Sequence, residues 1–473
     1  MSAGPADLPL REVIQSALEN NFSYRIASLE PEIARDGVTG EEAAFDVEVF
    51  ASGELSRFEQ TTIGPQSGTT SSDNRGWNAG ARKRLTQGAT VTAQTNLDRG
   101  VSDSRPLSQT ADFSVSIRQP LLQGYGTSAN TAAVKRARAG LAASSATWRQ
   151  AVLDLLARTE TAYWQVARFQ EQLQLDQSNM EVAEALVEET FEKERLGLAT
   201  RIDLLQAEAF KAESLEKIIT TKRALGDAFD QLLAYMGTLP GSSFPKDLDS
   251  TVSPLPENGP PVPEFQATWV MALASDPSLE AQSARIDQRK LDQTSSRDRA
   301  RPRLDLVLSG AYSGADGESA DRAYRYAIDR EGEAWSVGFE FSMPWSRRQE
   351  KATIRIADKR LEQDSLRYDE LKQALYQEVR ASWRSLSAVQ QSMEAARLTV
   401  SLQEASFERE KGKYEQGLSD FRDVLEAQRD LDQARVRLLG SKFTKLATEI
   451  ELGRLAGTLF ERHGIPAGLT YEK

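Results

Sequence analysis

The side chains best placed for chemistry in this chain are acids that follow a turning glycine. Gly417 precedes Asp420, Asp423 and Glu426, which are spaced three residues apart. A glycine in the left-handed conformation ends a helix, and an aspartate followed three residues later by an acid is a favourable start for the next one. Helix capping therefore accounts for Asp420 and Asp423, and it leaves Glu426 unexplained.

The rest of the inventory argues against an enzyme. The 473 residues include no cysteine, which removes thiolate metal sites and cysteine nucleophiles, and they include no GxxxxGK phosphate loop. The only histidine, His463, lies near the C-terminus, where we expect a solvated tail residue. We expect the aromatic residues Tyr163, Trp164 and Trp383 to pack between helices. The sequence therefore predicts no catalytic residue, no cofactor and no metal site.

Charge and hydropathy limit the partners and the location. The formal net charge of -12 argues against nucleic acid, whose phosphates need a basic surface. No run approaches the ~20 apolar residues of a transmembrane helix. The segment Met1–Pro5 lacks the charged and apolar regions of a signal peptide. We therefore expect either a cytoplasmic chain or a processed form that begins with a replacement methionine.

The chain repeats itself. Gly197–Ala207 returns 220 residues later as Gly417–Ala427, and the same offset carries Gly237–Leu239 onto Gly457–Leu459. So long a period indicates an internally duplicated body and not a solenoid.

We predict four segments of one body. Residues 1–239 form a first structural repeat of helix, strands and a long helical hairpin, and residues 264–459 form the second. Residues 240–263 hold seven of the 17 prolines, so we expect an extended linker without helix or ladder bonds. Residues 460–473 form a C-terminal tail.

Very long helices dominate the pattern. Residues 141–196 and 346–411 contain neither glycine nor proline, and each run reverses into a second helix. The first run carries one heptad seam and a second apolar stripe beside it, so we expect neighbours on two sides. Because one chain should not cover both stripes, we predict a trimer. The seam comprises Trp148, Val152, Leu155, Thr159, Ala162, Val166, Phe169 and Leu173; the second stripe comprises Leu156 and Tyr163.

Other segments alternate apolar and polar residues, as strands with one apolar and one wet face do. They are Asp46–Phe58, Ala111–Arg118, Leu304–Tyr312 and Trp335–Met343, with long polar loops expected at Thr61–Arg75 and Gly314–Arg330. Trp77–Leu97 predicts a further hairpin. A soluble sheet or a transmembrane β-barrel would produce this alternation. The lack of another apolar layer favours the barrel, with lipid contacted by Val47, Val49, Phe113, Val115, Ile117, Trp335, Val337, Phe339 and Phe341.

The order of elements resembles the TolC-type outer-membrane efflux protein family, the outer membrane factors of tripartite efflux and type I secretion systems. The resemblance covers residues 8–459. The matching segments are Leu8–Asn21, Arg118–Leu122, Met343–Trp345 and Gly417–Ala427, which runs on to Gly457–Leu459.

The resemblance implies a fold and a function. The fold is mainly α with a transmembrane β-barrel, in which duplicated helical hairpins form a periplasmic α-barrel. About four strands per protomer would close a twelve-stranded barrel in a homotrimer, or six per protomer if the Trp77–Leu97 hairpin joins it. The function is an exit duct in the Gram-negative outer membrane. It passes substrates from an inner-membrane pump and a periplasmic adaptor to the exterior.

The resemblance also assigns roles at the hairpin ends. Asp423 and Glu426 match acids that ring the periplasmic gate, and Tyr414 matches a tyrosine beside it, whereas the first repeat carries neutral Gln206 in place of Glu426. Six carboxylates in a trimer would favour cations and could bind a divalent ion. The adaptor would contact the helical tips at Gly197, Leu198, Thr200, Gly417, Leu418 and Ser419, although both leucines could instead pack within their capping motifs.

Two questions stay open at this point. A soluble or periplasmic coiled-coil scaffold without transport activity is the alternative function, and it leaves the strands and the duplicated turns unexplained. The sequence does not separate drugs, metals and proteins as cargo.

Overall fold

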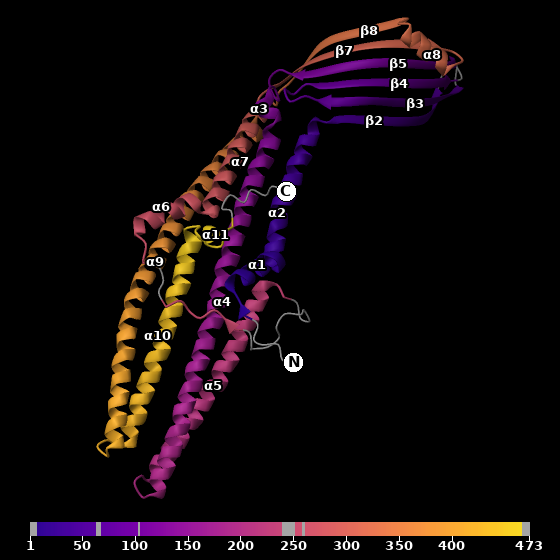
Figure 1. Ribbon diagram of the computed structural model, residues 1–473. Helices are drawn as coiled ribbons and strands as arrows, with labels where there is room; N and C mark the ends of the chain where they lie inside the picture. The colour runs from indigo at the N-terminus through magenta and orange to yellow at the C-terminus, as the bar shows by residue number, and fades with distance from the viewer. Residues whose placement is uncertain (1–6, 63–67, 103–104, 239–250, 258–260, 466–473) are drawn as a thin grey trace. The chain divides into compact units, whose positions relative to one another are not determined.

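The computed structural model describes residues 7–62, 68–102, 105–238, 251–257 and 261–465 (Figure 1). The chain divides into two compact units, and each draws on both predicted repeats. Unit 1 comprises residues 1–31, 145–281 and 368–473, and unit 2 comprises residues 32–144 and 282–367. The fold is mainly helical, and no helix among the described residues is both long and apolar enough to cross a membrane.

Unit 1 is built from helices and one short strand pair. Its own elements are β1 (Asp7–Leu8), α1 (Leu10–Asn20), α5 (Arg201–Met236), β6 (Thr251–Val252), α6 (Phe265–Ser275), α10 (Phe421–Leu455) and α11 (Leu459–Arg462). Four helices contribute residues to both units: α2 (Phe22–Glu42), α4 (Ala132–Arg195), α7 (Pro277–Arg299) and α9 (Arg348–Glu415).

The core of unit 1 covers both apolar stripes of α4. Val152 of the seam and Leu156 and Tyr163 of the second stripe are fully buried in one cluster with residues of α5 and α10. The Tyr163 hydroxyl donates to Leu8 O at 3.0 Å and accepts from Ser253 N at 2.9 Å. The inference that a single chain leaves one stripe uncovered is therefore wrong, because its own N-terminal segment and linker cover it.

Two further expectations in unit 1 need correction. Thr251 and Val252 pair in parallel with Asp7 and Leu8, so the linker does form ladder bonds there; residues 239–250 and 258–260 lie outside the described residues. His463 is not a solvated tail residue: its Nε2 lies 3.0 Å from Oε2 of fully buried Glu160. A buried carboxylate requires polar partners, and the C-terminal segment supplies one.

The expected aromatic packing is confirmed. Tyr163 and Trp164 of α4 belong to the buried cluster that also contains residues of α5 and α10. The rings of Trp383 and Phe265 pack with their centroids 5.8 Å apart, and the Trp383 indole N–H donates to Pro263 O at 2.8 Å.

Unit 2 contains an antiparallel sheet of six strands, ordered β2-β3-β4-β5-β7-β8 (Figure 1). Its elements are η1 (Ala43–Phe45), β2 (Val47–Thr62), β3 (Gly68–Arg84), β4 (Thr90–Ser102), β5 (Arg105–Pro120), α3 (Thr127–Asn130), β7 (Arg303–Asp316), α8 (Ala320–Ile328) and β8 (Gly332–Ser342). The expectation of about four strands is thus replaced by six, the alternative that the predicted hairpin allowed.

Both predicted polar loops contain regular structure. β3 begins at Gly68, inside the loop expected at Thr61–Arg75, and residues 63–67 lie outside the described residues. The loop expected at Gly314–Arg330 includes the end of β7 and helix α8. α8 packs on the sheet through buried Ala323 and Ala327, whose backbone closely approaches Gly314.

The strand register separates an apolar face from a polar one. Directly paired residues share a face of the sheet. By the register of the strands, Val49 of β2, Val115 of β5 and Trp335 of β8 lie in one row across the sheet and therefore on one face. Ile117 and Val337 lie in a neighbouring row of the same face. On the other face, Asn96 donates to Asp112 at 3.0 Å, and Arg82 pairs with Glu48 at 2.7 Å. α8 covers part of the apolar face, where Tyr324 contacts Phe113.

Candidate functional site

The two long hairpins of unit 1 reverse through the same backbone motif. Gly197 and Gly417 adopt left-handed φ angles of 72° and 73°. The next residue in each turn donates its N–H to a carbonyl five residues back, Leu198 to Lys193 at 2.8 Å and Leu418 to Lys413 at 2.9 Å. This is a Schellman ending, which a glycine permits without steric cost. The prediction of glycine-capped reversals is confirmed.

The helices that follow the turns begin differently. Thr200 forms a capping box in which its hydroxyl accepts from Asp203 N at 3.2 Å and the Asp203 carboxylate accepts from Thr200 N at 2.8 Å. Asp420 occupies the equivalent position of α10, but its side chain makes no cap hydrogen bond. The side-chain cap predicted at Asp420 is thus absent, whereas its counterpart Thr200 forms one.

Asp423 and Glu426 share the exposed side of α10. The neighbouring residues Val424, Leu425 and Ala427 are buried, so the helix turns its apolar side to the core and both acids away from it. Asp423 takes no part in a capping box and accepts instead from Ser419 Oγ at 3.3 Å, an atom that also lies 3.1 Å from Glu410. The second turn therefore presents two exposed carboxylates that no cap uses.

Tyr414 lies on the packed side of the turn and not with the two acids. The centroids of the Tyr414 and Phe421 rings lie 5.7 Å apart, and Lys193 Nζ lies 3.9 Å from the centroid of the Tyr414 ring. Burial raises the pKa of the Tyr414 hydroxyl. Because Lys193 belongs to α4 and Tyr414 to α9, this cation–π contact joins the ends of the two hairpins.

A second polar contact joins the hairpins further from the turns. Arg429 of α10 pairs with Glu213 of α5 at 3.0 Å, and its guanidinium lies 5.7 Å from the Phe210 ring. Burial opposes ionisation of Glu213, but hydrogen bonds and the charges of Lys217 and Arg429 outweigh it and lower its pKa. A buried apolar cluster also draws on both hairpins, with Ala183, Leu186, Ala207, Phe210, Phe421 and Leu425.

The tips themselves expose apolar side chains. Leu198 is 75% exposed and Leu418 is 73% exposed. A leucine that served the capping motif by packing on its own helix would be largely covered. Their exposure argues against that alternative and leaves both leucines available to a partner.

Sequence reasoning missed a buried acidic pair between the hairpins. Asp432 of α10 is 5% exposed and Asp176 of α4 is 4% exposed. Burial raises the pKa of Asp432 to about 6, against the opposing effects of Lys217, Gln428 and Arg435, and nearby Asp176 adds to the rise. Gln428 donates to Asp432 at 2.8 Å, and Thr221 donates to Asp176 at 2.6 Å.

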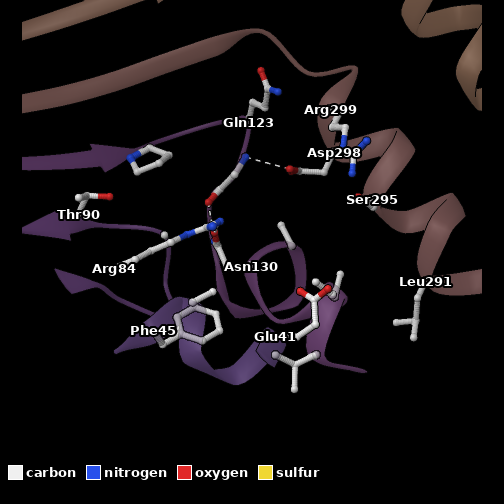
Figure 2. Close-up of a pocket in the computed structure, with 18 of the residues that line it drawn as sticks. Glu41, Phe45, Arg84, Thr90, Gln123, Asn130, Leu291, Ser295, Asp298 and Arg299 are labelled. Atoms are coloured by element: carbon white, nitrogen blue, oxygen red, sulfur yellow. Dashed lines mark hydrogen bonds between the residues drawn. The ribbon is translucent and has the colours of Figure 1, made fainter. Parts of the chain in front are cut away.

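Unit 2 contains a polar cavity of about 650 Å³ at the start of α3 (Figure 2). Asn130 donates to Gly124 O at 2.7 Å and accepts from Arg84 at 2.8 Å, while Asp298 accepts from Gly124 N at 2.9 Å. Its charged lining is mixed and includes Arg84, Arg299, Glu41 and Asp298. These contacts fix the loop between β5 and α3.

Comparison with known proteins shows which family the chain matches. The family model for outer membrane efflux proteins matches residues 13–238 and 269–458. The outer membrane efflux protein BepC of Brucella suis is 21% identical over 374 residues, which cover 78% of this chain and 77% of BepC. Outer membrane protein TolC of Escherichia coli is 23% identical over 65% of this chain, and the match spans 62% of TolC.

Solved structures agree on the fold. The outer-membrane channel OprN matches with a TM-score of 0.72 and 17% identity over 95% of this chain and 89% of OprN. The outer membrane protein VceC of Vibrio cholerae matches with a TM-score of 0.68 and 16% identity over 95% of this chain and 96% of VceC. With most of its length matched by the family model, the chain belongs to the outer membrane efflux protein family.

Proposed function

We propose that this chain forms the outer-membrane exit duct of a tripartite efflux or type I secretion system, as a homotrimer. The main support for the proposal is the two-faced sheet. All nine residues expected to contact lipid lie on one face of it, and hydrogen-bonded polar side chains lie on the other. Transmembrane barrels have this division between an apolar exterior and a polar lumen.

Helix α2 supports association with other copies. Its exposed apolar residues follow a helical spacing and are Phe22, Ile26, Leu29 and Ile33. An apolar stripe of this length on one helix is typical of a protein–protein contact. This stripe replaces the uncovered seam of α4 as the argument for a homotrimer.

In the trimer, Asp423 and Glu426 form the gate ring. Three copies contribute six carboxylates to the periplasmic mouth, where they favour cations over anions. The tip residues Leu198 and Leu418 dock the periplasmic adaptor, which links the duct to its inner-membrane pump. Their exposure supports this role.

Arginine substitution on the two faces tests the membrane assignment. Val115→Arg should destabilise the trimer by about 2–4 kcal/mol because a charge would enter the bilayer, whereas Ser116→Arg should have little effect. Unfolding in lipid vesicles measures the difference, with native mass spectrometry reporting the trimer. Equal effects at both positions, or a stable monomer, would support the scaffold alternative instead.

A further inference from the structure

The hairpin formed by β3 and β4 is a full part of the sheet. β3 pairs with β2 from Val47↔Lys83 to Thr62↔Gly68, and β4 pairs with β5 from Thr90↔Arg118 onward. In the described sheet β2 and β5 are therefore separated by two strands. No rearrangement short of breaking both ladders would remove the hairpin from the sheet.

The turn of this hairpin is fastened to the loop after β5. Gln87 O accepts from Gly126 N at 3.1 Å, and Arg84 donates to Asn130 at 2.8 Å (Figure 2). Gly88 has a φ of 101°, and a Cβ there would lie 2.3 Å from Gly124 O. Only glycine fits so close an approach in this conformation. The hairpin is therefore held at its turn as well as along both strands.

The two edges of the sheet can pair with each other between copies. The six strands alternate in direction, so β2 at one edge and β8 at the other run antiparallel (Figure 1). β8 of one copy can thus extend the ladder of β2 in the next without breaking the alternation. Both edges carry exposed apolar side chains on the same face, Val49 at 81% and Trp335 at 76%. Open edges of this kind are covered in natural proteins, and ring closure covers them all.

We propose that three copies close a ring of 18 strands through β2–β8 pairing between neighbours, in place of the twelve that four strands per copy would give. This inference rests on the proposed trimeric duct. Barrel diameter grows about linearly with strand number, so the ring is about 1.5-fold wider, and barrels of 16–18 strands enclose an aqueous channel. The polar face with Asn96 and Asp112 lines it. The outer duct therefore admits bulky hydrated cargo, and the helical end sets the size limit.

Electron cryomicroscopy of the trimer in lipid nanodiscs tests the proposal directly. We expect 18 paired strands in the membrane. A trimer with twelve strands and β3–β4 outside the ring would overturn this inference and leave the duct intact. A protein that forms no trimer would overturn both.

Disulfide mapping gives an independent result, because the chain has no cysteine of its own. Ser52→Cys on β2 is combined in turn with Ala334→Cys, Ser336→Cys or Gly338→Cys on β8, because all four positions lie on the polar face. One register should yield covalent trimers on a denaturing gel. The matched control pairs Ser52→Cys with Thr92→Cys, which lies on the same face but on interior strand β4, and it should yield none. Covalent trimers from the control alone would contradict the ring.

Discussion

The two hairpin ends share one backbone design and differ in their side-chain chemistry. In the first, Asp203 is held in a capping box with Thr200, and neutral Gln206 follows. In the second, Asp420 makes no cap bond, and Asp423 and Glu426 stay exposed. The duplicated turn has thus kept its glycine and its backbone hydrogen bonds, while one copy uses its acid for local stability and the other leaves two acids exposed.

This difference shows where each hairpin gains its stability. The first turn is stabilised by its own cap. The second lacks that side-chain cap, keeps its backbone hydrogen bonds, and contacts the first hairpin through Lys193 with Tyr414 and Arg429 with Glu213. Polar contacts of this kind suit a gate, because they can be exchanged without unfolding the helices.

The largest difference in stability between the two hairpins should come from Asp432. Its counterpart in the first hairpin is Ala212, so only the second hairpin buries an acid there. The folded-state pKa of about 6 lies above the ordinary 3.8, so the native state prefers the neutral form. The contribution of Asp432 to stability is therefore fully present below about pH 4 and is lost as pH rises through 6.

Asp432→Asn should stabilise the protein by about 2–3 kcal/mol at pH 7 and hardly at all at pH 4, since it removes the cost of burying the charge. Thermal unfolding across this pH range measures the change. Exposed Asp430→Asn on the same helix is the matched control and should change stability by less than about 0.5 kcal/mol. An effect of Asp432→Asn that is the same at both pH values would show that the carboxylate titrates normally.

The second-largest difference in stability should come from the residues that begin α5 and α10. Thr200→Ala should destabilise the start of α5 by about 1 kcal/mol, because it breaks the capping box, while Asp420→Ala should change α10 little. Hydrogen exchange at the first-turn amides reports both, with about fivefold faster exchange expected only in α5. Equal acceleration in the two helices would mean that the turns are stabilised alike.

The pair between Arg429 and Glu213 should give the smallest stability effect. Both side chains are half exposed, so a double-mutant cycle should yield about 0.2–1 kcal/mol, and less in high salt. Its loss should still raise channel opening, because it joins the hairpins. Lys211–Glu184, a pair of similar length within the first hairpin, is the control. If disrupting either pair opened the channel equally, the link between hairpins would have no special role.

The sequence predicted the long helices, their reversals and most strands, because these depend on local signals: the absence of glycine and proline, the turning Gly197 and Gly417, and two-residue alternation. It missed the early part of β3, where Ser71, Asp73 and Arg75 put polar residues on a face that carries Trp77 further along. Without an apolar stripe, that stretch has the pattern of a loop.

The missed features of the site depend on distant contacts. An acid on a charged helix, such as Asp432, has the pattern of a solvated residue until a second hairpin more than two hundred residues away in sequence covers it. His463 is similar, since its partner Glu160 comes from another helix. The gate role of Asp423 and Glu426 is implied by the family resemblance, and the sequence adds that the first repeat carries neutral Gln206 where the second carries Glu426.

Single-channel recording in a planar bilayer addresses the gate ring itself. The variant Asp423→Ala with Glu426→Ala should lose cation selectivity and block by divalent or trivalent cations, because the carboxylate ring is gone, while the trimer remains folded. The control, Asp203→Ala with Gln206→Ala, alters the equivalent positions of the first repeat and should retain both properties. Unchanged selectivity and block in the first variant would contradict the gate ring and leave Asp423 and Glu426 as ordinary surface charges.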